Sequence, residues 1–63
     1  MIQVRYDPEA DALFVRLAEG RIEDTEEVAP GVMLDFDAEA RIVAMEFLKV
    51  SERVAPTSFA IAA

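Results

Sequence analysis

A five-residue pattern that occurs twice constrains the fold of this chain more than any other feature. The letters YDPEA at residues 6–10 and FDAEA at residues 36–40 each give an aromatic residue, an aspartate, a spacer, a glutamate and an alanine. Each copy lies between two short runs that are rich in apolar residues. Aspartate and proline favour turns, and apolar runs on both sides of a short turn are typical of hairpins. The repeated pattern therefore predicts two β-hairpins with acidic turns.

The runs beside these turns alternate between apolar and polar residues, with the period of two that a half-buried strand requires. Strands are expected over residues 2–6, 12–17, 32–36 and 42–48. The last of these segments also has helical propensity. We prefer a strand there because Ile42, Val43 and Phe47 are good β-formers and because the second hairpin requires one.

The segment between the two hairpins is less regular. Residues 21–28 are mostly acidic and poor in β-formers, so both an exposed strand and an irregular arm remain open there. Pro30 followed by Gly31 is typical of a type II turn.

The expected fold class is mainly β, a β-rich α+β domain. Its sheet is a single antiparallel meander of four to five strands built from hairpins, because short turns join antiparallel neighbours. One face is expected to form the core: Ile2, Val4, Tyr6, Leu13, Val15, Leu17, Val32, Leu34, Phe36, Val43, Met45 and Phe47. The other face is not fully polar, since Ala12, Phe14, Met33, Ile42, Ala44 and Leu48 project there. Something must therefore cover part of both faces.

The chain is expected to end in a short helical turn and a tail. Residues 51–54 favour one helical turn with Ser51 as N-cap, which Pro56 stops. We expect a single domain over residues 1–55 and an apolar tail over residues 56–63. The tail carries Phe59 and Ile61 at strand spacing, and an added edge strand, a partner-binding arm and a frayed end all remain open.

Size and composition favour self-association. The chain has 63 residues, no cysteine and no histidine, so neither a disulfide nor a zinc ion bound by those residues can stabilise it. Small domains of this kind often gain stability by forming oligomers. A hydrophobic fraction of 54% is high for so small an interior, and we therefore expect a homo-oligomer.

The net charge of −7 limits the partners that the chain can bind. Excess carboxylates repel phosphate, so nucleic acid and anionic membranes are not expected as partners. A small basic protein fits this charge, although the charge also serves solubility alone. No apolar stretch has the length of a membrane span and no signal peptide is visible, so a cytoplasmic location is expected.

The acidic residues are the candidates for chemistry. Asp35 and Glu46 have the spacing of the first and last ligands of a calcium-binding loop, but Ala40 stands where that loop needs glycine. The two acidic turns would bring carboxylates together if they lay at one end of the sheet, yet a sheet this small offers little cleft. Without histidine or cysteine, nucleophilic triads are absent. We expect no catalytic residue, no metal site, no cofactor and no enzymatic activity. The alternative is a small carboxylate-based or metal-assisted enzyme assembled at an oligomer interface.

The second apolar face is the better candidate for function. The expected interface residues are Phe14, Met33, Ile42, Leu48, Phe59 and Ile61. Contiguous exposed apolar patches usually mark interfaces. Coverage by the chain's own C-terminus and homodimer packing without further function remain open as alternatives.

Three blocks of the chain, residues 6–17, 26–37 and 42–48, together resemble the small prokaryotic YuzE-like family, domain of unknown function number 2283. The sequence departs from that family at Ala40, where glycine is common, and in its apolar tail after Val54. The resemblance implies a compact β-rich domain and no established activity, cofactor or catalytic residue. It also implies an antitoxin-type role, since members occur beside small toxin-like proteins. The expected function is a non-enzymatic, self-associating protein-interaction module, with an antitoxin-like role toward a small basic toxin as its most specific form.

Overall fold

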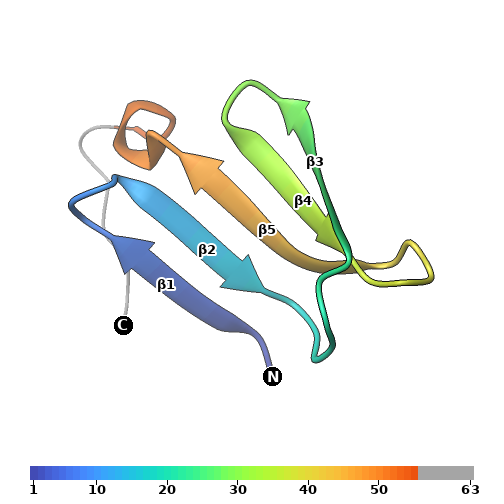
Figure 1. Cartoon of the computed structure of the whole chain (residues 1–63). Helices are drawn as coiled ribbons and strands as arrows, with labels where there is room; N and C mark the ends of the chain where they lie inside the picture. Colours follow the sequence, from blue (N-terminus) through green and yellow to red (C-terminus); the bar gives the residue numbers. More distant parts are fainter. Residues whose placement is uncertain (56–63) are drawn as a thin grey trace.

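The computed structural model describes residues 1–55 as one open, five-stranded antiparallel sheet followed by a short 3-10 helix (Figure 1). The elements are β1 (Gln3–Asp7), β2 (Ala12–Arg16), β3 (Asp24–Ala29), β4 (Val32–Phe36), β5 (Ile42–Leu48) and η1 (Val50–Glu52). The expected fold class is confirmed, and residues 42–48 form a strand rather than a helix. Phe59, Ile61 and the rest of the expected tail lie outside the described residues.

Both acidic turns close hairpins, as the repeated pattern predicts. β1 pairs with β2 around the first turn, and β4 pairs with β5 around the second. A third hairpin joins β3 to β4 through Pro30 and Gly31, where Gly31 has the positive φ of 74° that a type II turn requires. β3 is a regular strand in the segment that the sequence left open, apart from a register shift between Glu27 and Ala29.

The order of the strands, β1-β2-β5-β4-β3, differs from that of a simple meander. β5 lies between β2 and β4, so the chain passes from the end of β2 to the far edge of the sheet before β3 begins. Residues 17–23 make this connection and give it length that a tight turn lacks. Where this connection begins, just after β2, the amides of Leu17 and Ala18 both donate hydrogen bonds to the Val43 carbonyl, at 2.8 and 3.1 Å. A two-residue turn would have placed β3 beside β2.

The strand register places most of the expected core residues on one side of the sheet. We call this side the apolar face and define it by Val4, Tyr6, Leu13, Val15, Val32, Leu34, Met45 and Phe47, which pair with one another across the strands. The opposite side is the second face, defined by Arg5, Ala12, Phe14, Arg16, Met33, Asp35, Ala44, Glu46 and Leu48.

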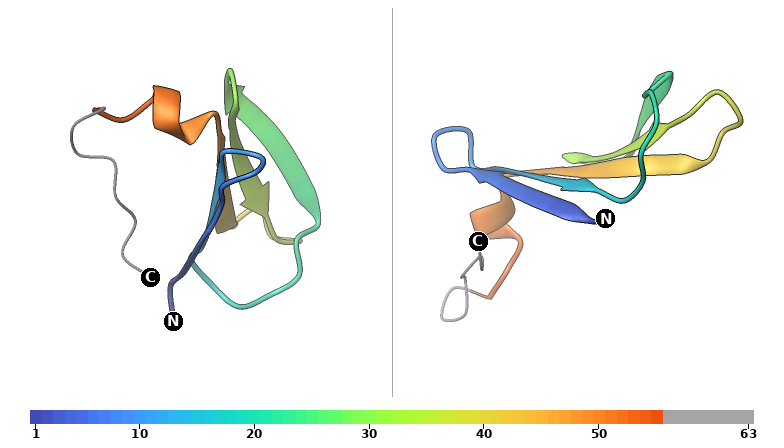
Figure 2. Two further views of the ribbon diagram at one scale, coloured as in Figure 1. Left: turned by 90° about the vertical axis from the view of Figure 1, so that its left-hand side faces the viewer. Right: turned by 90° about the horizontal axis from the view of Figure 1, so that it is seen from below.

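Of the expected core residues only Val43 is buried, so the expectation that the apolar face forms a buried core is otherwise wrong. Among residues 1–55, the buried hydrophobic residues are Val43, Ala44 and Val50. Of the other expected core residues, Ile2, Val4 and Leu17 are 62%, 53% and 37% exposed, and the rest are half-buried. Figure 2 shows the reason: the strands form one layer, and within residues 1–55 no second sheet or long helix packs on either face.

The C-terminal turn covers one end of the apolar face (Figure 2). η1 carries Val50 into a position where only 5% of its surface is exposed, and Val54 lines the same pocket as Leu13 and Phe47. The expected helical turn is thus confirmed, but Ser51 is not its N-cap. Lys49 precedes the turn in the left-handed conformation with φ 52°, without a side-chain cap. Ser51 instead binds the first acidic turn.

Candidate functional site

The first acidic turn anchors the C-terminal turn to the sheet. The Asp11 carboxylate accepts hydrogen bonds from the Tyr6 hydroxyl at 2.8 Å and from the Ser51 hydroxyl at 2.6 Å. The Ser51 amide donates to it at 3.1 Å, and the Val50 amide donates to the Asp11 carbonyl at 3.0 Å. The bond from the Ser51 side chain, followed by that from Tyr6, holds the pKa of Asp11 below its usual range. The same bond to Asp11 raises the pKa of Tyr6.

The second acidic turn makes its contacts within itself. Asp37 accepts hydrogen bonds from the amides of Glu39 and Arg41, both at 2.9 Å. The Arg41 guanidinium folds back to form ion pairs with Asp37, at 3.3 Å, and with Glu39. The hydrogen bond from the Arg41 amide is the main reason why the pKa of Asp37 lies below its usual range.

The two acidic turns lie at opposite ends of the sheet. The first turn precedes Ala12, which pairs with Leu48 at the end of β5, whereas the second turn precedes the start of β5 at Ile42. Carboxylates from the two turns therefore cannot meet within one chain. An acid–base pair made from both turns would have required them to lie at the same end of the sheet. Their assembly across subunits stays a hypothesis.

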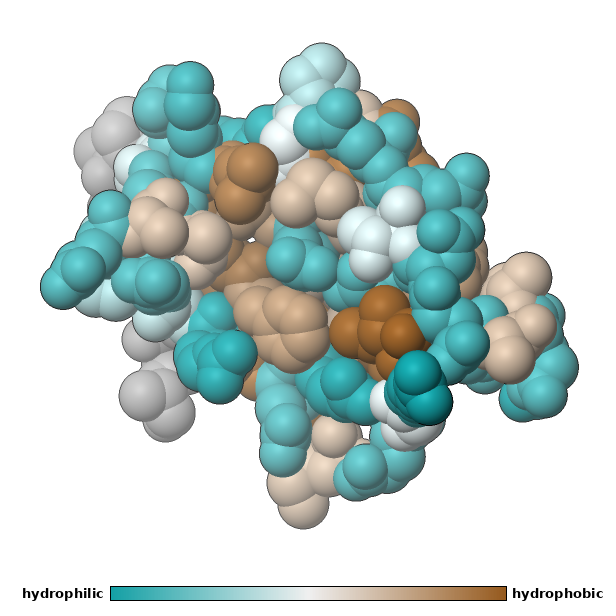
Figure 3. Space-filling view, in the orientation of Figure 1, coloured by the Kyte–Doolittle hydropathy of each residue, from teal (hydrophilic) through white to brown (hydrophobic). Residues whose placement is uncertain are grey.

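The expected interface residues come together only in part. Phe14 and Met33 lie on the second face on either side of Glu46, which pairs with both. Leu48 lies on the same face and is 42% exposed, while Ile42 is 45% exposed beside the register shift opposite Phe36. Because Glu46 stands between Phe14 and Met33, the apolar patch is interrupted. Figure 3 shows this face as apolar areas set among hydrophilic ones.

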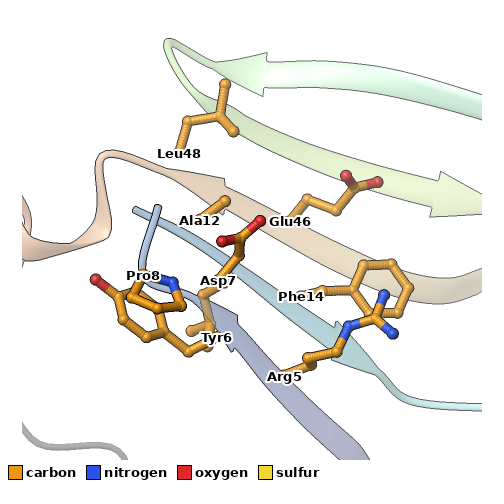
Figure 4. Close-up of a pocket in the computed structure, with 9 residues that line it drawn as sticks. Arg5, Tyr6, Asp7, Pro8, Ala12, Phe14, Glu46 and Leu48 are labelled. Atoms are coloured by element: carbon orange, nitrogen blue, oxygen red, sulfur yellow. The ribbon is translucent and has the colours of Figure 1, made fainter. Parts of the chain in front are cut away.

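A shallow groove of about 470 Å³ opens on the second face beside β1. Its lining includes Arg5, Asp7, Phe14, Glu46 and Leu48 (Figure 4). The Arg5 guanidinium lies 5.7 Å from the centre of the Phe14 ring, a cation–π distance. The groove is open and mixes charges of both signs, so it resembles a binding surface more than an enclosed reaction centre.

Asp35 and Glu46 form a carboxyl pair on the second face that was not predicted from the sequence. Asp35 is only 1% exposed, and its Oδ1 accepts a 2.6 Å hydrogen bond from the Thr25 hydroxyl. Its Oδ2 is buried without a hydrogen-bond partner. Glu46 projects from β5 toward β4 (Figure 4), and the register makes it a diagonal neighbour of Asp35 on the same face. Contact with the Asp35 carboxyl, then burial, then the Asp35 charge raise the pKa of Glu46.

A signal for this pair was present in the sequence. Asp35 and Glu46 have the spacing of the first and last ligands of a calcium-binding loop, and that interpretation places both residues in one loop. The register places them on neighbouring strands instead, with Asp35 opposite Ala44 and Met33 opposite Glu46, so they are diagonal neighbours. Alternation within each strand, combined with the predicted hairpin, would have found them.

The described part of the chain contains no group of three or more acidic residues arranged to hold a metal ion. Within residues 1–55, the 3-10 turn is the only helical element, and no helix has the length and apolar character to cross a membrane.

The chain belongs to a family described as a protein of unknown function (DUF2283), whose pattern matches residues 3–51. The match covers all five strands and reaches into η1. It confirms the resemblance to domain of unknown function number 2283. Neither a curated protein nor a solved structure matches the chain.

Proposed function

We propose that this chain is a non-catalytic protein-interaction domain that self-associates through its apolar face. One observation carries the proposal: the sheet has a single layer, and within residues 1–55 only the C-terminal turn lies against that face. Exposed apolar surface of this extent costs free energy in water, and a second copy offers a matching surface.

The size of the apolar face suits a dimer interface. Strands about 4.8 Å apart and about five residues long give the sheet a flat area of roughly 400 Å². Two such faces, packed about 10 Å apart with interdigitating side chains, bury on the order of 1,000 Å² in total, where specific interfaces begin. The contact is therefore large enough for a stable but modest dimer.

The distribution of charge supports the same arrangement. On β1, β2, β4 and β5 the apolar face carries no charged residue. Asp24 and Glu26 lie on the same side only at the β3 edge, where they pair with Phe36 and Leu34. Charge depletion at the centre and a polar rim are features of protein interfaces. The remaining charges repel a second copy at long range, so salt should strengthen the dimer.

A second candidate function is the capture of a small basic protein by the second face, the antitoxin-like role. Its support is the net charge of −7 together with the partly apolar surface around Phe14 and Leu48. A dimer formed through the apolar faces would leave this surface free. Attraction between opposite charges weakens with salt, so the two candidate contacts have opposite salt dependence. We place both activities in the cytosol, the location expected from the sequence.

The test is sedimentation equilibrium of the full chain from low to high micromolar concentration, at low and high salt. Wild type should form a dimer that tightens as salt rises. Val4→Glu introduces a charge into the apolar face at a residue 53% exposed, so the single chain should keep its fold. It should weaken the dimer at least about tenfold, because a buried charge without a partner costs several kcal/mol.

Val28→Glu is the matched control. Val28 is 54% exposed and lies at the register shift of β3, outside the paired apolar face. It should leave the dissociation constant of the dimer unchanged, and circular dichroism should show both variants folded. A wild type that stays monomeric at every concentration, or two variants that behave alike, would refute self-association through this face.

A further inference from the structure

The Asp35–Glu46 pair is the most unusual feature of the second face. Buried polar atoms nearly always have hydrogen-bond partners, and burying a charged oxygen without one is costly. Asp35 Oδ2 is buried and without such a partner, while the Thr25 hydroxyl satisfies Oδ1. The register makes the Glu46 carboxyl a diagonal neighbour of Asp35 on the same face of the sheet, in a position to serve Oδ2. Two ionised carboxylates have no hydrogen to place between them.

The basic residues of the surrounding elements are engaged elsewhere. On β1 and β2, Arg5 lies over the Phe14 ring and the Arg16 guanidinium donates to the Gly20 carbonyl. Arg21, in the connection after β2, pairs with Glu23 at 3.0 Å. The other charged residues that the register places on the second face are Arg5 and Asp7 (β1), Arg16 (β2) and Glu27 (β3), whereas Asp24 and Glu26 of β3 pair with Phe36 and Leu34 on the opposite side. Within residues 1–55, the ion pairs are formed by Arg21 and Arg41 only, so no cation neutralises the pair.

We propose that Asp35 and Glu46 form a proton-binding site on the second face, in which one proton from solvent is shared between Asp35 Oδ2 and the Glu46 carboxyl. Two carboxyl groups in contact cannot both ionise cheaply, and one shared proton removes the repulsion and satisfies the buried oxygen. A divalent metal suits the site less well, because two carboxylates and a threonine hydroxyl fall short of the six to eight oxygen ligands that calcium takes. This inference is independent of self-association.

The shared proton makes stability depend on pH with a definite sign. The folded chain keeps the Glu46 proton to a higher pH than the unfolded chain does, because the pKa of Glu46 is raised in the fold. Between the unfolded and the folded pKa, the folded state therefore binds more protons, and stability falls as pH rises. Above the folded pKa this contribution levels off, and the second face has gained one negative charge.

The direct test is a carbon-detected NMR titration of the side-chain carboxyls in the full chain. In wild type, the Glu46 midpoint should lie above the ordinary glutamate range, and in Asp35→Asn it should fall toward that range. Asp35→Asn keeps an oxygen for Thr25, so the local fold should survive. A Glu46 midpoint in the ordinary range in wild type, or one that Asp35→Asn does not lower, would overturn the proposal. So would a midpoint that drops when millimolar calcium is added, because a metal would then occupy the site.

Urea unfolding gives a second readout. Glu46→Gln supplies an amide that donates to Asp35 Oδ2 at every pH, so the variant should have a higher urea midpoint than wild type at neutral pH. The gain should vanish at acid pH, where wild type holds its proton. Glu19→Gln removes one charge from an exposed residue and should produce no such pH-dependent gain. Equal gains in the two variants would mean that general charge repulsion, and not the pair, is responsible.

Discussion

The two acidic turns have nearly the same sequence and share one local hydrogen bond. Asp7 accepts a hydrogen bond from the Glu9 amide at 3.0 Å, and Asp37 accepts one from the Glu39 amide at 2.9 Å. This bond is the one that aspartate commonly makes in turns, with the backbone two residues ahead. The repeated pattern therefore specifies how each chain reversal begins.

The two turns differ in the residue that follows the repeated pattern. Asp11, after the first, binds Ser51 forty residues away and so joins the C-terminal turn to the sheet. Arg41, after the second, forms ion pairs with Asp37 and Glu39, so its side-chain contacts stay within that turn. A local repeat can thus set two similar turns, while a single residue outside it decides which turn serves tertiary structure.

The largest expected effect comes from Asp11→Gly. Glycine adopts the positive φ of 51° at this position without strain, so the variant isolates the loss of the carboxylate. Ser51 loses its acceptor and η1 should loosen, and exposing Val50 alone costs about 1.5 to 3 kcal/mol. Thermal unfolding and hydrogen exchange at the Ser51 amide measure the two effects. Asp37→Gly removes the carboxylate that organises the other turn, and it should lower the melting temperature less and leave Ser51 protected; equal effects would contradict the comparison.

The Asp11 contribution should also depend on pH. Because the pKa of Asp11 is lowered in the fold, its stabilisation is present above the unfolded pKa and is lost as pH falls through the folded one. The difference in melting temperature between wild type and Asp11→Gly should therefore shrink in acid.

Glycine substitutions at the last residue of each pattern should have opposite signs. Ala40 has φ 63°, a left-handed conformation that costs an alanine roughly 1 kcal/mol or more, so Ala40→Gly should stabilise the chain by about 0.5 to 1 kcal/mol. Ala10, the equivalent residue, is absent from the positive-φ positions, and Ala10→Gly should destabilise slightly through chain entropy. Urea unfolding measures both. A loss of stability in Ala40→Gly would show that the second turn tolerates alanine without strain.

The smallest effect is expected from Arg41→Ala. The Arg41 side chain is 75% exposed, and exposed ion pairs contribute about 0 to 1 kcal/mol. Urea unfolding should detect a small loss at low salt that fades at high salt. A loss that persists at high salt would indicate that Arg41 acts through packing rather than charge.

The sequence was sufficient to predict four of the five strands and left the fifth, β3, open. Period-two alternation and turn chemistry are local, and they located both acidic hairpins and the Pro30–Gly31 turn. The strand order was not predictable in the same way, because residues 17–23 carry no signal for which edge the chain should reach. Burial also escaped prediction: alternation assigns Val4 to a face but does not say whether anything covers that face.

The same limit applied to the candidate site. Phe14 and Met33 were correctly placed on one face, but the continuous patch expected there is interrupted by Glu46. Asp35 was noted as a calcium-loop ligand, because spacing along the chain was considered without the register between strands. Thr25, whose hydroxyl donates a hydrogen bond to Asp35, lies in the segment whose structure the sequence left open.

The central position of β5 bears on how the chain is synthesised and folds. β5 is the last of the five described strands to leave the ribosome, yet the β1–β2 and β3–β4 hairpins join one sheet only by pairing with it. Isolated two-stranded hairpins are marginal in water. Until β5 emerges, the nascent chain should therefore be a pair of unstable hairpins with exposed apolar residues. Folding then awaits contacts between distant parts of the chain, and this delay is the period of greatest vulnerability to proteases and aggregation.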